Sequence, residues 1–120
     1  MANEIYKTAT FRANKGGARV EFSGTKNFDM SGDDMLSGTQ VIGTSSETVD
    51  LGDISGAPVV LVIKNLDSTN FVEIGGDSGL TVFKLKIPAG DFVVIQPSSA
   101  TIYAKADTAD VRIQTIAAEA

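Results

Sequence analysis

The sequence contains one short stretch whose residues could form a covalent intermediate in suitable surroundings. Gly76-Asp77-Ser78-Gly79 has the residue order that surrounds the nucleophilic serine of trypsin-like proteases. Such a serine needs a neighbouring base, normally a histidine held by an acid, to take its hydroxyl proton. The 120-residue sequence contains no histidine, and no Ser-x-x-Lys begins at Ser78. We therefore interpret the stretch as a turn between two strands and expect no catalytic residue and no enzyme activity.

Asp29, Asp33 and Asp34 offer a partial set of oxygen ligands for calcium, which prefers carboxylate and carbonyl oxygens. Their spacing departs from the EF-hand pattern, because Gly32 precedes Asp33 and no glutamate closes the loop. The alternative is that these three side chains are simply solvated. Asp107 and Asp110 are a weaker pair, and a tight turn between the last two strands explains them equally simply. Cysteine and histidine are both absent, and the sequence predicts no cofactor.

The charges are unevenly distributed along the chain, whose net charge is −5. Residues 1–26 carry five basic and two acidic side chains, a local charge of +3, and residues 27–120 carry five basic and thirteen acidic ones, a local charge of −8. The acidic majority argues against nucleic-acid binding. The basic segment is instead a candidate for binding an acidic protein surface, although a solvated charged hairpin would look the same. The candidate partner-binding residues are Lys7, Arg12, Lys15, Arg19 and Lys26.

Almost every segment has the composition or the alternation of a β-strand. Residues 5–12 and 19–22 predict a hairpin, and residues 23–38 predict a long loop, with a helical turn over 33–36 as an alternative for that part of it. The continuous apolar run over 59–65 is typical of a strand that is buried on both faces. Further strands are predicted over 40–51, 71–74, 80–87, 92–96, 101–105 and 111–116.

This spacing predicts an all-β fold, an antiparallel β-sandwich of jelly-roll type with eight or nine short strands. Residues 1–26 are expected to form a basic hairpin within the same domain as a β-sandwich core over 27–120. The longest notable apolar run, residues 57–63, is far shorter than the ~20 residues that span a bilayer, so no membrane partner is expected.

Three blocks in the second half resemble small β-structured virion proteins of tailed bacteriophages. Residues 60–75 contain an apolar strand, an N-x-D-x-T-N turn and F-V-E-I-G; residues 83–91 end in a Pro-x-Gly-Asp turn; and residues 99–107 contain Y-A-K-A-D. The resemblance covers about residues 59–116, and the first 55 residues match nothing in that family.

The resemblance implies a non-enzymatic capsid decoration (cement) protein that binds the outer face of the major capsid lattice. It implies the major capsid protein or another virion protein as partner, a homo-oligomer with a trimer favoured, and a place in a virion assembled in the bacterial cytoplasm. A neck, tail or fibre protein is one alternative. A carbohydrate-binding module is another, although the sequence has no tryptophan and only Tyr6 and Tyr103 as tyrosines.

Overall fold

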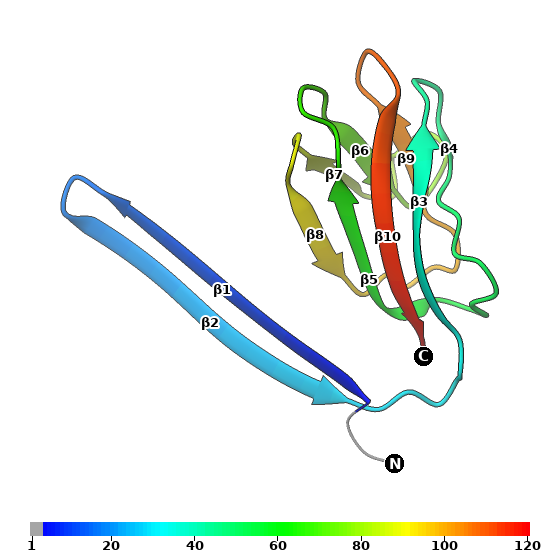
Figure 1. Cartoon of the computed structure of the whole chain (residues 1–120), viewed down its shortest axis with the longest axis horizontal. Coiled ribbons are helices and arrows are strands. Elements are labelled where there is room, and N and C mark those ends of the chain that lie inside the picture. Colours follow the sequence, from blue (N-terminus) through cyan, green and yellow to red (C-terminus); the bar gives the residue numbers. More distant parts are fainter. Residues whose placement is uncertain (1–3) are drawn as a thin grey trace. The chain divides into compact units, whose positions relative to one another are not determined.

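The computed structural model of the chain describes residues 4–120, and it divides into two compact units between Ser31 and Gly32. The described residues form ten β-strands, and none of them belongs to a helix that could cross a membrane. The two units are a two-stranded hairpin and an eight-stranded sandwich, both drawn in Figure 1. The all-β prediction is therefore confirmed, with ten strands in place of eight or nine.

The first unit is an antiparallel hairpin of β1 (Ile5–Lys15) and β2 (Ala18–Phe28). Its turn consists of Gly16 and Gly17, whose φ angles of 58° and 85° both lie in the left-handed region. Two positive φ angles in a two-residue loop are the requirement of a type I′ turn, which glycine meets without steric cost. This turn fixes the register along the whole length of both strands.

The prediction of a long loop over residues 23–38 is wrong. β2 continues to Phe28, and β3 (Met35–Ile42) begins shortly afterwards, so only six residues lie between the two strands. Residues 23–28 are small or polar and have a weak strand pattern, but the ladder with β1 pairs each of them. Residues 35–38 pair with β10 in the same way, and the helical turn expected there is absent.

The second unit is a sandwich of two four-stranded sheets, ordered β3-β10-β5-β8 and β4-β9-β6-β7. Its paired strands are antiparallel, and its first and last strands lie side by side, as in a jelly roll (Figure 1). The antiparallel sandwich predicted from the sequence is thus confirmed. The remaining strands are β4 (Glu47–Thr48), β5 (Pro58–Asn65), β6 (Val72–Gly75), β7 (Lys84–Ile87), β8 (Phe92–Ile95), β9 (Tyr103–Ala106) and β10 (Val111–Glu119).

The core lies between the two sheets and is built from alternate residues of each strand. Its fully buried large side chains include Ile42, Leu61, Ile63, Val72, Ile74, Ile87, Ile102, Val111 and Ile113. Every residue of this core cluster lies between Leu36 and Ala117. The hairpin supplies none of them and forms a compact unit of its own. The assignment of residues 1–26 to the same domain as the sandwich stays a prediction.

The N-x-D-x-T-N stretch locks the connection after β5. Asn65 is fully buried, and its Nδ2 donates to the carbonyl oxygens of Asn70 (2.9 Å) and Ile87 (3.0 Å). Its Oδ1 accepts the N–H of Asp67 (2.8 Å). The Asp67 carboxylate in turn accepts the N–H groups of Asn70 and Thr69, which lowers the pKa of Asp67. These residues thus have a structural role in the loop.

Candidate interaction surface

The hairpin has two chemically different faces. Directly opposed residues of an antiparallel pair project to the same side, and successive residues alternate between sides. The register therefore assigns every side chain to a face. We call the first the apolar hairpin face: Ile5, Lys7, Ala9, Phe11, Ala13, Lys15, Ala18, Val20, Phe22, Gly24, Lys26 and Phe28. The other is the polar hairpin face: Tyr6, Thr8, Thr10, Arg12, Asn14, Arg19, Glu21, Ser23, Thr25 and Asn27.

The apolar hairpin face is largely uncovered. Phe11 and Phe22 lie directly opposite each other and are 56% and 58% exposed, and Val20 beside them is 62% exposed. The ring of Phe22 lies over the backbone of Gly24, where an added Cβ would meet it at 2.8 Å. Large apolar side chains gathered on one side of a ribbon are typical of a surface that contacts another molecule.

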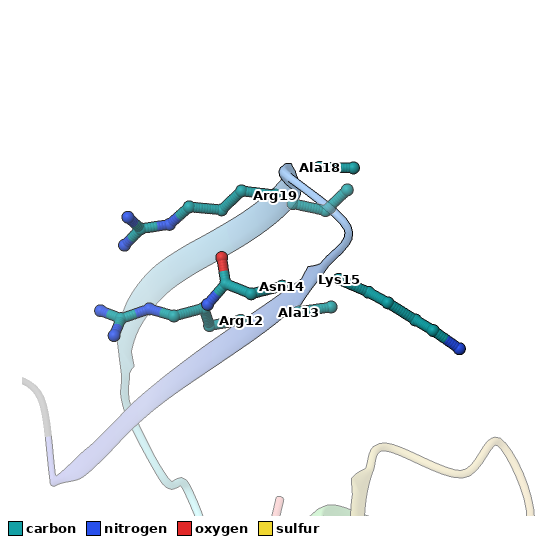
Figure 2. A pocket seen from close by; sticks show the side chains of 7 residues that line it. Arg12, Ala13, Asn14, Lys15, Ala18 and Arg19 are labelled. Atoms are coloured by element: carbon teal, nitrogen blue, oxygen red, sulfur yellow. The ribbon is translucent and has the colours of Figure 1, made fainter.

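The polar hairpin face makes its own side-chain interactions. Thr8 Oγ1 donates to the carbonyl of Gly24 (3.2 Å), and the Glu21 carboxylate accepts Arg12 Nε (3.1 Å) and Arg19 Nη2 (2.6 Å). Around the hollow at the hairpin tip, Figure 2 shows Arg12 and Arg19 extending to one side and Lys15 to the other. Exposed ion pairs of this kind contribute little stability, but they suit a face that remains in water.

The five basic residues predicted to bind a partner are all on the hairpin, but they do not form one patch. Arg12 and Arg19 are on the polar hairpin face, paired with Glu21. Lys7 and Lys26 are directly opposite each other near one end of the apolar hairpin face, and Lys15 is at its other end. The Lys7 ammonium lies 5.7 Å from the centroid of the Phe28 ring. Two like charges in opposition weaken an isolated strand pair, so an acidic partner would stabilise this end.

Ser78 lies in a turn, as the sequence predicted. The preceding Asp77 carboxylate accepts the hydroxyl (2.6 Å) and the N–H (2.6 Å) of Thr81 and the N–H of Val82 (3.0 Å). These bonds, led by the Thr81 hydroxyl, lower the pKa of Asp77. Leu80 completes the turn with a φ of 55°. Ser78 itself is exposed, on the rim of a polar groove of about 360 Å³.

The three aspartates considered for calcium are divided between the two units: Asp29 precedes the boundary at Ser31, whereas Asp33 and Asp34 follow it. The N–H of Asp33 donates to the carboxylate of Glu119 (3.1 Å), which also accepts the N–H of Ser55 (2.8 Å). These backbone donors, Ser55 first, lower the pKa of Glu119. Over residues 4–120 no three acidic side chains are grouped in a way that could hold a metal ion.

Comparison with known proteins gives no family for this chain. No family model matches it, and no curated protein matches it. Among solved structures, it is similar to a putative ethanolamine utilization protein Q from Salmonella typhimurium, with 14% identity and a TM-score of 0.48. That similarity covers 97% of this chain and 98% of the other. A likeness this distant assigns no activity to this chain.

The function predicted from the resemblance, a capsid decoration protein of a tailed phage, is contradicted by these comparisons. None of the comparisons links the chain to a virion: no family model or curated protein matches it, and a solved structure to which it is similar is described as an ethanolamine utilization protein. The blocks behind the resemblance are core strands and turns such as 65–70, whose residues stabilise the sandwich. Residues of this kind are shared by unrelated proteins with similar folds, so they could not indicate a function.

Proposed function

We propose that this chain is a non-enzymatic protein–protein interaction module whose hairpin binds through the apolar hairpin face. The observation that carries the proposal is the uncovered row of Phe11, Val20 and Phe22 on a hairpin that shares no residue with the sandwich core. A two-stranded hairpin is only marginally stable by itself in water. Covering its apolar side would therefore stabilise the hairpin and bind the partner at the same time.

The available energy is sufficient for a specific contact. Complete burial of a large apolar side chain contributes about 1.5–3 kcal/mol, and Phe11, Val20 and Phe22 are each more than half exposed. These three residues alone therefore offer roughly 3–5 kcal/mol before the entropic cost of association is subtracted. The remaining apolar positions of this face and its three lysines would add to that contribution.

The chemistry of the face also defines the partner. It combines apolar side chains with Lys7, Lys15 and Lys26, whereas the two arginines of the hairpin are engaged by Glu21 on the other side. The matching surface is an apolar strip with acidic groups at its ends. We infer that the partner is a protein with such a strip.

A photo-crosslinking amino acid at Phe22 tests the proposal in cells that express the protein. The matched control places the same group at Ser23, the next residue of β2, which is on the polar hairpin face. We expect covalent protein adducts from position 22, fewer from position 23, and loss of the position-22 adducts when Phe11→Ser is added. Equal labelling from both positions, or adducts from neither, would show that the apolar hairpin face is not a binding surface.

A further inference from the structure

The sandwich carries a second apolar surface, on the side of the sheet β3-β10-β5-β8 that faces away from the core. In β10 and β5 the residues that alternate with the buried ones point outward. The register aligns Val62 with Ile116 on one neighbouring strand and with Val94 on the other. We call this surface the outer sheet face; its apolar members are Met35, Val41, Val60, Val62, Phe92, Val94, Ile116 and Ala118.

The outer sheet face exposes apolar side chains at positions where an antiparallel sheet usually has polar ones. Ile116 and Val94 are 41% and 42% exposed and Phe92 is 58% exposed, whereas the inward-facing Ile113 and Ile63 are fully buried. An antiparallel sheet with one face in water normally alternates apolar inward and polar outward residues. Here the middle of the outward side of three neighbouring strands is apolar, at Val62, Val94 and Ile116, with polar residues such as Lys64, Gln114 and Arg112 towards one end. An apolar middle on both sides of a sheet is typical of a sheet that is covered on both sides.

Acidic groups lie at both ends of this face. The exposed Asp33 and Asp34 are at the end where β3 begins and β10 finishes, and the Glu119 carboxylate beside them is bound by their backbone N–H groups. At the opposite end Asp110 precedes β10 and Asp91 precedes β8, beside the outward-facing Lys64 and Arg112. The first end thus has acidic groups only, and the second end has both signs. The outer sheet face is therefore an apolar strip with one acidic end, which suits the paired lysines of the apolar hairpin face, and one end of mixed charge.

The lengths of the two surfaces also agree. The pair Lys7 and Lys26 is eight residues along β1 from Lys15, a distance of about 26 Å in an extended strand. Eight residues also separate Val111 from Glu119 in β10, again about 26 Å. A hairpin that lies along β10 and β5 can therefore place its paired lysines at the wholly acidic end. Lys15 then reaches the end of mixed charge, where Asp110 and Asp91 lie beside Lys64 and Arg112.

We propose that the apolar hairpin face of one copy of this chain packs on the outer sheet face of a second copy. This deepens the proposed function, on which it rests, by naming the partner. Each copy gives one hairpin and receives one. A ribbon about 36 Å long and about 10 Å wide covers about 350 Å². Two such contacts, counted on both partners, bury about 1,400 Å², within the range of specific protein interfaces.

The connection between the two units favours a second copy over the chain's own sandwich. The N–H of Met30 donates to the Glu4 carboxylate (3.1 Å) in the hairpin, and the N–H of Gly32 donates to the Ala120 carbonyl (2.9 Å) in the sandwich. Only Ser31 lies between these two anchored residues. A linker of one residue leaves the hairpin little freedom to fold back onto the sheet to which it is joined. Short hinges favour exchange between copies.

The first test is the mass of the purified full-length protein by light scattering, with increasing concentration. We expect a closed oligomer whose dissociation constant rises at least about tenfold with Phe22→Ser or Ile116→Ser. Thr10→Ser, a change on the polar hairpin face, leaves it unchanged. A wild-type protein that stays monomeric to its solubility limit overturns the proposal.

The second test identifies which sheet receives the hairpin. Copies with the photo-crosslinker at Phe22 are mixed with heavy-isotope-labelled copies, and the adducts are digested and analysed by mass spectrometry. Mixed-isotope peptides that join position 22 to β5, β8 or β10 support exchange between copies. Adducts only within one copy, or no adducts, overturn the proposal. The proposed function would still stand if the experiment in cells gave position-22 adducts with a different protein, and it is overturned only if neither experiment gives adducts with another molecule.

Discussion

Replacing Asn65 by alanine is expected to destabilise the sandwich strongly, although the side chain is polar and makes no contribution to the apolar core. Asn65 is fully buried and uses both ends of its amide: Nδ2 donates to two carbonyl oxygens and Oδ1 accepts one N–H. The bond to the Ile87 carbonyl joins the end of β5 to the end of β7, which belongs to the other sheet. The substitution therefore removes a link between the two sheets and leaves their polar groups without a partner.

The size of the effect follows from these three bonds. Each contributes about 1 kcal/mol net, and a buried carbonyl left unsatisfied costs about 1–3 kcal/mol more. The Ile87 carbonyl is the most deeply buried of the three partners, so we expect Asn65→Ala to lower the free energy of unfolding by about 3–5 kcal/mol. Asn65→Asp should cost a similar amount near neutral pH, because a carboxylate cannot donate to the two carbonyls.

Urea unfolding followed by far-ultraviolet circular dichroism measures this change in free energy. The matched control is Ser68→Ala in the same loop, where the side chain is exposed and the expected change is within about 0.5 kcal/mol. A loss below about 1 kcal/mol for Asn65→Ala would refute the argument, since it would mean that water replaces all three bonds without cost.

Three further predictions concern the sandwich. Thr115→Val should stabilise it by about 1 kcal/mol, since the buried Oγ1 has no hydrogen-bond partner within the described residues; a lower urea midpoint would contradict this. Gly75→Ala should lower the free energy of unfolding by roughly 1–3 kcal/mol, because the new Cβ would lie 2.5 Å from the Phe83 carbonyl oxygen. In the control Gly38→Ala the new Cβ enters open space, so the free energy of unfolding should not fall. Asp77 and Glu119 have pKa values in the folded protein that lie below their ordinary values of 3.8 and 4.5. In acid the unfolded chain therefore binds more protons than the folded one, so the stability that these two groups contribute is present above those ordinary values and is lost as the pH falls below them. Urea midpoints measured towards acid pH should fall less steeply for Asp77→Asn than for the wild type.

The strands whose buried positions carry large apolar side chains were predictable from the sequence. β5 and β10 were found because their core positions are large and apolar. Only residues 40–42 of β3 were, as part of the strand predicted over 40–51. The inward positions of β3 include Gly38 and Gln40, so the ladder with β10 and not an apolar pattern makes residues 35–39 a strand. The strand predicted over 80–87 starts only at Lys84, since the Asp77 carboxylate binds the first amides of that segment and closes a turn.

The candidate surface was predictable only in part. The positive charge of residues 1–26 is evident from a count of side chains, and the five basic residues are indeed on one hairpin. Their division between two faces depends on the register, which the turn at Gly16 and Gly17 fixes. The alternation of Ala18, Val20, Phe22, Gly24, Lys26 and Phe28 along β2 was the signal that could have revealed it.

The apolar run of β5 was interpreted from the sequence as a strand buried on both faces, and a single chain satisfies only half of that prediction. Leu61 and Ile63 are in the core, whereas Val60 and Val62 are half-buried on the outer sheet face. A hairpin from a second copy along β5 and β10 would supply the missing layer. The same contact would cover the apolar hairpin face, which has no core of its own. One interface would therefore account for two unusual features of the sequence. The first is β5, which is more apolar than a strand with one side in water normally is. The second is the hairpin, which has an apolar face but no core of its own.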